Sequence, residues 1–145
     1  AIDGLWFLTV EKEFGNNEAI RLDKKVWKEY VHVLVKRMKT LMGITPKGIK
    51  DIRKIVEIDP LFLTTDYEIL EPSSNTVLLV INRCPVLEAM ERAGREKFIC
   101  ESTTGLYFRN LANEIDPNII VHALKLPPRK NLEDVCCKWL FQCED

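Results

Sequence analysis

The spacing of apolar residues changes after Asp59-Pro60, and this change constrains the fold more than any other feature of the sequence. Before it, apolar side chains recur every three or four positions, which is typical of a helix with one buried face. After it, short apolar runs bounded by turn residues are typical of strands. A chain of 145 residues has the usual length of one domain. We therefore expect a single α+β domain over residues 1–145, with a helical part at 1–60 and a sheet-containing part at 61–145.

The first part contains start and stop signals for three helices. Asp3 is a good N-cap, and Gly15 and Gly43 can end helices by adopting a left-handed conformation. Thr45-Pro46 marks another helix start, because a capping hydroxyl is followed by proline at the first helical position. The predicted helices cover residues 3–14, about 23–42 after a short helical piece, and 45–58.

The second part should form an antiparallel sheet of about four strands with helices packed on one face. The run Thr76 to Arg83 is apolar on both faces, so it should lie inside the sheet rather than at an exposed edge. The composition of Pro72 to Asn75, just before it, predicts a hairpin turn. The predicted strands cover residues 65–71, 76–83, 118–126 and 135–142, and the predicted helices cover residues 86–93 and about 102–115.

The bulk composition excludes several classes of protein. A formal net charge of -1 gives no general attraction to nucleic acid, which binds clustered Lys and Arg. The longest apolar run, Thr76 to Ile81, is far shorter than the roughly 20 residues of a membrane span. Five cysteines, an odd number, without a secretory signal indicate a reducing compartment. We expect a soluble, cytoplasmic protein that binds neither nucleic acid nor a membrane.

Three cysteines occupy positions that could form a site. Cys84 lies between a predicted strand and a predicted helix, where backbone N–H groups and the helix dipole favour the thiolate. Cys100 lies just before the next predicted helix. Cys137 should share one strand face with Trp139 and Phe141. If the last strand pairs beside the strand that ends at Cys84, the three sulfur atoms could converge.

His122, in the third predicted strand, is the natural fourth ligand for a Cys3His zinc site with these cysteines. The spacing is not that of a zinc finger, since the chain has no CxxC pair. The alternative is that the cysteines fill the core and that His122 is a structural residue. Strand alternation predicts that Cys136 faces away from Cys137.

The same residues suggest a catalytic alternative. Cys84 could act as a nucleophile, or a metal-activated water could attack, with His122 or Glu101 moving protons. No pair of carboxylates has a spacing that marks an acid and a base, and the chain contains no phosphate-binding glycine loop. An exposed carboxylate at a helix start is the simpler interpretation of Glu101.

Several motifs stand in order along the chain: Trp6-Phe7-Leu8-x-Val10-Glu11-x-x-Phe14-Gly15, Ala19-Ile20, Val26-Trp27, Cys84-Pro85-Val86, Gly94, Cys100, Asp116-Pro117, Pro127-Pro128 and Cys137-Lys138-Trp139-x-Phe141. Together they resemble a poorly characterised family of bacterial and archaeal proteins over most of the chain. The C-terminal half is also similar, more distantly, to the L-2-amino-thiazoline-4-carboxylic acid hydrolase-like family, and more faintly to 4-vinyl reductase-like ligand-binding domains.

The hydrolase-like resemblance rests on Cys84, Gly94, Cys100 and Cys137, and it implies that the three cysteines act together. Two departures leave the substrate open. Trp139 stands where that family usually has Phe, and Glu101-Ser102-Thr103 follows Cys100 without the aspartate expected nearby.

Three hypotheses follow. The favoured one is a protein that binds a small molecule or a metal ion, with zinc as the possible cofactor, at a cysteine-based site. The second is a hydrolase of a C=N or amide-like bond. The third is a non-catalytic interaction module, a homodimer formed through the amphipathic N-terminal helices.

Overall fold

The computed structural model describes residues 2–95 and 97–143. The helices in this part of the chain are α1 (Ile2–Phe14), α2 (Asn16–Met42), α3 (Asp51–Ile58), α4 (Pro85–Arg92) and α5 (Thr104–Ile115), with a short 3₁₀ helix, η1, at Pro60–Phe62. The strands are β1 (Asp66–Ser73), β2 (Thr76–Arg83), β3 (Ile119–Lys125) and β4 (Cys137–Cys143). The predicted α+β class, with N-terminal helices and an antiparallel sheet, is confirmed.

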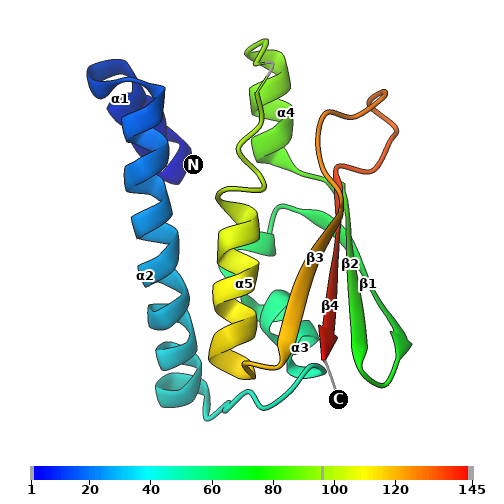
Figure 1. Cartoon of the computed structure of the whole chain (residues 1–145). Helices are drawn as coiled ribbons and strands as arrows, with labels where there is room; N and C mark the ends of the chain where they lie inside the picture. The colour runs from blue at the N-terminus through cyan, green and yellow to red at the C-terminus, as the bar shows by residue number, and fades with distance from the viewer. Residues whose placement is uncertain (1, 96, 144–145) are drawn as a thin grey trace.

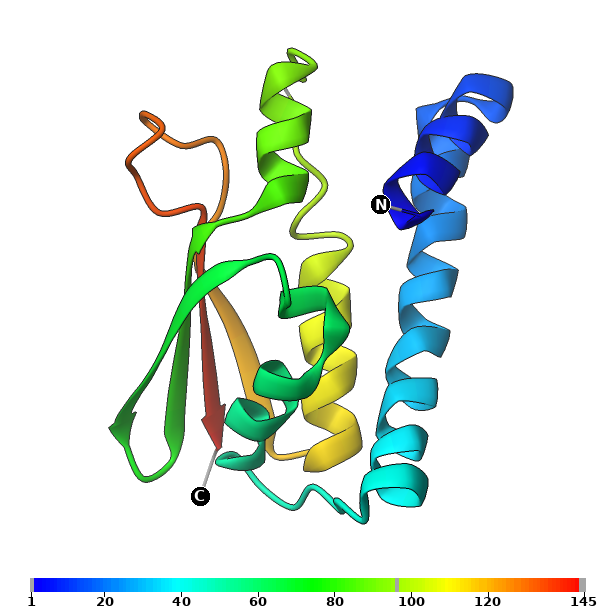
Figure 2. The same cartoon turned by 180° about the vertical axis from the view of Figure 1, so that it is seen from behind.

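The helices lie on one face of the sheet in successive layers (Figure 1; Figure 2). The helix α5 lies against the sheet, and α2 runs along the far side of α5 with α1 folded back beside it (Figure 1). The helix α4 continues upward from the end of β2, beyond the edge of the sheet (Figure 2). The other face of the sheet points away from every labelled helix.

The sheet has the strand order β1-β2-β4-β3, and all neighbouring strands are antiparallel. The interior position predicted for residues 76–83 is confirmed, because β2 pairs with β1 on one side and with β4 on the other. The register places Val77 opposite Phe141, Leu79 opposite Trp139, and Ile81 opposite Cys137. These pairs face the helices and form the sheet's contribution to the core.

Aromatic residues dominate the contact between α5 and the sheet. Phe108 of α5 has its ring centroid 5.2 Å from that of Trp139 and 5.3 Å from that of Phe141. All three side chains are fully buried. Tilted and edge-to-face contacts at these separations are favourable for aromatic rings and add to the free energy gained by burying their surface. This contact packs α5 against β4, and α5 also contacts β3.

Two predicted helix boundaries were wrong. The short helical piece and the helix predicted from about residue 23 form one helix, α2, which begins at Asn16, because Ala19 packs fully buried and only Gly15, at φ 86°, separates α2 from α1. The helix α3 begins at Asp51 rather than at Thr45-Pro46. Gly48 adopts φ 97°, which interrupts a right-handed helix.

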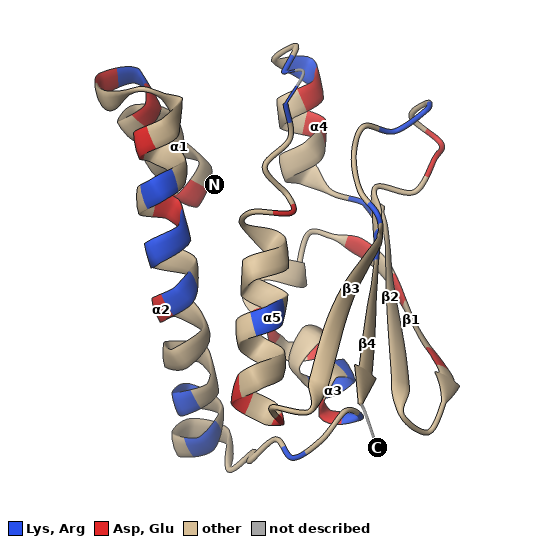
Figure 3. Cartoon of the chain, in the orientation of Figure 1, with Lys and Arg blue, Asp and Glu red and all other residues tan. Residues whose placement is uncertain are grey.

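Charged side chains of both signs lie mainly on the helices and loops, whereas most of β2, β3 and β4 is uncharged (Figure 3). No helix in the described part of the chain combines the length and apolarity needed to cross a bilayer.

Candidate functional site

Cys84 joins the central strand β2 to α4. Its backbone is extended, and Pro85 is the first residue of the helix. Its carbonyl oxygen accepts a hydrogen bond from the backbone N–H of Glu88 at 3.0 Å, which begins the helical hydrogen-bonding pattern. The side chain is half-buried. Proline suits this first helical position because its missing N–H would have no partner there.

Cys136 and Cys137 lie beside this junction, at the start of β4. The backbone N–H of Cys136 donates to the carbonyl oxygen of Ile81 at 2.8 Å, and Cys137 pairs with Ile81. The thiol of Cys136 donates to the carbonyl oxygen of Asn82 at 3.4 Å. The antiparallel pairing of β2 with β4 therefore brings residues that are more than 50 positions apart in the sequence to the same end of the sheet.

The placement of Cys136 corrects a prediction. Strand alternation required it to face away from Cys137, but β4 begins at Cys137 and Cys136 lies in a bend before the strand. Alternation therefore does not apply to it. Its side chain is 1% exposed and belongs to the same core cluster as Cys137.

Cys100 reaches this region from the segment that precedes α5. Its carbonyl oxygen accepts a hydrogen bond from the N–H of Gly105 at 2.9 Å, which ties the segment to the first turn of the helix. Burial, together with nearby charge on Cys84 and Cys136, raises the pKa of the Cys100 thiol to about 11. Cys100 therefore lies within electrostatic reach of two other cysteines.

Cys137 completes the group. Burial raises its pKa to about 12, a hydrogen bond from Trp139 lowers it, and charge on Cys100, Cys84 and Cys136 raises it. The indole Nε1–H of Trp139 donates to the sulfur of Cys137 at 3.2 Å. We refer to Cys84, Cys100, Cys136 and Cys137 as the cysteine cluster. The chain segments predicted from sequence to supply Cys84, Cys100 and Cys137 thus meet, and Cys136 joins them.

A buried ion pair borders the cluster. Arg129, in the β3–β4 connection, binds Glu91 of α4, and its side chain is 5% exposed. Burial raises the pKa of the Cys136 thiol, whereas the positive charge of Arg129 and a hydrogen bond from the backbone N–H of Cys84 lower it. Cys136 is thus the member of the cluster that lies beside a fixed positive charge.

The structure does not bring His122 to these cysteines. His122 pairs with Leu140 in the sheet, so its side chain lies on the face opposite Trp139 and Cys137, and it is exposed. Alternation places it there because Val121, its neighbour, is buried on the helix side. The Cys3His ligand set is therefore not assembled in this structure.

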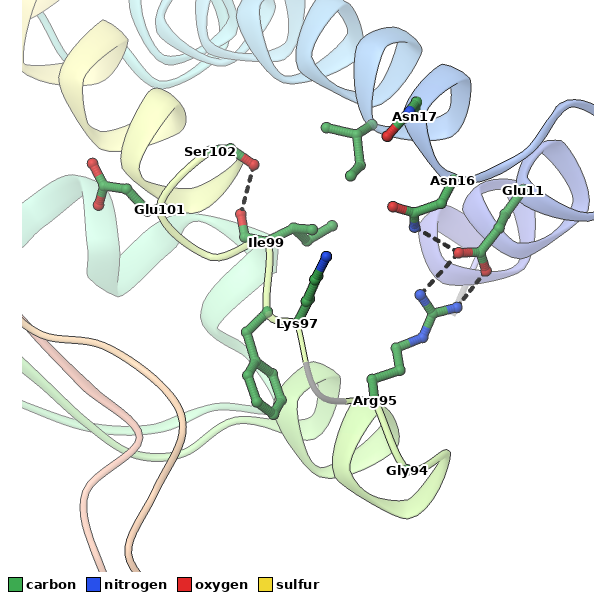
Figure 4. A pocket seen from close by; sticks show the side chains of 11 residues that line it. Glu11, Asn16, Asn17, Gly94, Arg95, Lys97, Ile99, Glu101 and Ser102 are labelled. Atoms are coloured by element: carbon green, nitrogen blue, oxygen red, sulfur yellow. Dashed lines mark hydrogen bonds and ion pairs between the residues drawn. The ribbon is translucent and has the colours of Figure 1, made fainter.

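Glu101 forms a half-exposed ion pair with Arg109. Its carboxylate accepts a hydrogen bond from Arg109 at 2.9 Å, and half of its side-chain surface is exposed. Figure 4 shows Glu101 pointing away from Ile99 and Lys97. This position of Glu101 matches the simpler interpretation from the sequence, which was an exposed carboxylate at a helix start.

The cysteine cluster lacks ready-made coordination geometry. In the described residues, no three His, Cys, Asp or Glu side chains stand where they could hold a metal ion without moving. Any coordination by the cluster thus requires changes in side-chain rotamer. The half-buried side chains of Cys84 and Cys100 have more room for such a change than the buried Cys136 and Cys137.

A separate polar cavity of about 760 Å³ lies between the α1–α2 connection and the segment before α5. On one wall, Arg95 and Asn16 both donate to the carboxylate of Glu11, at 2.9 and 2.7 Å. Lys97 projects into the space between Asn16 and Ile99 (Figure 4). Sequence reasoning missed this cavity, because its walls come from elements far apart in the chain.

These features define a small α+β protein with a thiol cluster at one end of its sheet and a polar cavity near it. The chain belongs to a family of unknown function, DUF6125, whose model matches residues 1–143. This result agrees with the predicted membership of an uncharacterised family. A comparison with curated proteins gives no match. The comparisons show no link to L-2-amino-thiazoline-4-carboxylic acid hydrolase-like or 4-vinyl reductase-like proteins.

Proposed function

We propose that this protein binds a thiophilic metal ion, with zinc as the first candidate, through the cysteine cluster. The observation that carries the proposal is the convergence of cysteines from the β2–α4 junction, the segment before α5 and the start of β4. Thiolates are soft ligands that favour zinc and similar ions, with Zn–S distances of about 2.3 Å. A reducing compartment such as the cytoplasm would keep the thiols available.

The fourth ligand in this proposal is Cys136 rather than His122. Cys136 lies within electrostatic reach of Cys84, Cys100 and Cys137, whereas His122 occupies the other face of the sheet. A four-thiolate set is a common closed zinc site. Arg129 beside Cys136 would offset part of the negative charge that four thiolates carry.

Metal binding must displace protons from this cluster. Burial raises the pKa of Cys100 to about 11 and that of Cys137 to about 12, so both are protonated at neutral pH without metal. Because the metal binds thiolates, its affinity should rise with pH, and binding should release protons.

The test is to measure the zinc content of protein purified under reducing conditions, and then to titrate the metal-free protein with zinc. We expect one equivalent per chain for the natural sequence and for His122→Ala. Cys84→Ser and Cys100→Ser should weaken binding at least about tenfold.

Cys143→Ser is the matched control, because Cys143 lies at the opposite end of β4 from the cluster. It should bind zinc like the natural sequence. Substoichiometric zinc in every preparation, with no difference between Cys84→Ser and Cys143→Ser in the titration, would sink the proposal. Loss of zinc on replacing His122 would contradict the proposed ligand set.

We favour binding over hydrolysis because of where the two candidates for proton transfer lie. His122 lies on the opposite face of the sheet, and Glu101 is paired with Arg109. A hydrolase of a C=N or amide-like bond needs a group within hydrogen-bonding reach of the transferred proton. Turnover of a thiazoline carboxylate that is lost in Cys84→Ala would overturn this preference.

A second candidate is the binding of a small organic carboxylate in the polar cavity. Its volume of about 760 Å³ falls within the roughly 300–1,000 Å³ of ordinary ligand sites. Lys97 supplies a positive charge, and Ile20 and Ile99 supply apolar surface. In an NMR titration with a panel of small mono- and dicarboxylates, the signals of Lys97, Ile20 and Ile99 should shift. The shifts should be absent in Lys97→Glu and unchanged in Lys12→Glu.

A further inference from the structure

The face of the sheet away from the helices, which we call the open face, carries a group of apolar side chains among polar ones. The apolar side chains come from alternate residues of the strands, namely Leu70, Leu78, Val80, Ile120, Leu124 and Leu140. All labelled helices lie on the other side of the sheet (Figure 1; Figure 2). A solvated sheet face usually carries polar side chains. The apolar side chains at these positions therefore favour contact with a partner.

Several of these side chains are well exposed. Leu124 is 56% exposed, Leu70 is 47% exposed and Ile120 is 37% exposed. On the helix face of the same sheet, Trp139 and Phe141 are 0% exposed. An apolar group of this kind marks an interaction surface more often than an isolated exposed leucine does.

The strand register arranges the open face in rows across the sheet. One row runs Leu70, Leu78, Leu140, His122 from the β1 edge to the β3 edge. The neighbouring row runs Glu68, Val80, Lys138, Lys125 in the same direction. The second row thus begins with an acid at the β1 edge and ends with two bases toward the β3 edge. Figure 3 shows acidic residues along β1.

We propose that the open face binds the open face of a second copy of this chain, with the two-fold axis parallel to the strands. This axis reverses the order of the strands, so β1 of one subunit lies over β3 of the other, and β2 lies over β4. Leu78 then meets Leu140 of the partner subunit at the centre. Two sheets packed this way lie about 10 Å apart at roughly 30°.

Charge selects this axis over the other two-fold arrangement. Reversing the strand order places Glu68 diagonally beside Lys138 of the partner subunit and over the partner's Lys125, which also binds Asp134 within its own chain, and symmetry repeats the contact. An axis perpendicular to the strands would instead place β1 over β1 and lose this pairing. Asn82 donates to Glu68 at 3.0 Å, which holds the carboxylate at the sheet surface.

The first measurement is the mass of the purified full chain by sedimentation equilibrium over a concentration series. The natural sequence should give a dimer. Leu140→Glu places a charge at the centre of the interface and should raise the dimer dissociation constant roughly thirtyfold or more. Leu8→Glu, at a residue of α1 that is 51% exposed, is the matched control and should leave the constant unchanged.

A charge exchange tests the orientation without changing the apolar centre. Glu68→Lys and Lys138→Glu should each weaken the dimer about twofold to fivefold, and the double variant should recover the natural value. A natural sequence that stays monomeric overturns the proposal. So does dissociation by Leu8→Glu but not by Leu140→Glu, which would place the interface on the N-terminal helices. Single and double charge variants with additive losses would overturn the proposed axis.

Discussion

Asp59 shows how a single polar residue can stabilise the junction of three helices. Its carboxylate is 1% exposed and accepts hydrogen bonds from the hydroxyl of Tyr30 at 2.7 Å, the hydroxyl of Tyr107 at 2.5 Å and the N–H of Leu61 at 3.0 Å. These donors come from α2, α5 and η1. A buried carboxylate is tolerated only when its oxygens are paired in this way.

Replacing Tyr107 by phenylalanine should destabilise the protein by about 1–3 kcal/mol, because the buried carboxyl group of Asp59 loses a donor that water cannot replace. Tyr30→Phe should cost less, since Tyr30 is half-buried and water can reach the vacated position. Urea unfolding of the two variants tests this. If both variants lost the same free energy of unfolding, burial of the tyrosine would not control the effect.

Asp23 is the other buried acid in the described part of the chain, and one of its oxygen atoms is unpaired there. It is 3% exposed, and among the described residues its Oδ1 atom has no hydrogen-bond partner. Burial and the nearby charge of Asp3 raise its pKa to about 6, against a hydrogen bond from Trp27 that lowers it. The folded protein therefore holds a proton on Asp23 at a pH where the unfolded chain has released it.

This shift predicts the sign of a pH effect. The stability contributed by protonated Asp23 is fully present below its unfolded pKa of 3.8 and is lost as pH rises through about 6. Asp23→Asn should match the natural sequence near pH 4 and exceed its stability by up to about 3 kcal/mol at pH 7.5. Unfolding curves at both values test this, and an advantage of the variant at low pH alone would contradict it.

At the scale of elements, the start of α5 can lie close to β4 because Gly105 has no side chain. A Cβ atom on Gly105 would stand 3.1 Å from the ring of Trp139 and 2.9 Å from Arg109. Arg109 can move, but Trp139 is fully buried and donates to Cys137. The close approach of this helix therefore depends on glycine.

Gly105→Ala should cost about 1–3 kcal/mol through overpacking against Trp139. Gly4→Ala is the matched change in another helix, where a Cβ atom meets nothing within 4 Å. It should be neutral or stabilise α1 by up to about 1 kcal/mol, because alanine has the higher helix propensity. Thermal unfolding of the two variants gives the comparison, and equal effects would rule out the packing argument.

Local signals predicted most elements because each signal acts over a few residues. Residues 76–83 form β2 as predicted, and Gly94, at φ 66°, follows α4 where a helix stop was expected. The start of α3 was missed, because Thr45-Pro46 resembles a helix start while Gly48 and a hydrogen bond from the N–H of Lys47 to Asp51 form a turn.

For the whole molecule, the pairing of β2 with β4 decides which cysteines meet. The sequence predicted the involvement of Cys84, Cys100 and Cys137, because each lies at the boundary of an element or on a core-facing strand position. The role of Cys136 could not be predicted, since β4 begins two residues later than expected and the alternation of side chains does not apply to a residue before the strand.

If the cysteine cluster binds zinc, the metal should also stabilise the whole fold. Binding to the folded state alone contributes about 2.7 kcal/mol at a zinc concentration one hundred times the dissociation constant. The unfolding midpoint should therefore rise on adding zinc to the natural sequence and to Cys143→Ser, but not to Cys100→Ser. A rise of the same size in all three proteins would show that zinc stabilises them through another site.

The sequence by itself determined the fold class, the order of most helices and strands, and which cysteines stand at their ends. These properties depend on residue spacing and on turn and capping chemistry, which act locally. Only the tertiary structure decided that His122 faces away from the cysteines, that Cys136 joins them, and that one face of the sheet stays uncovered by the helices. Those outcomes depend on strand order and register, which arise from contacts between distant segments.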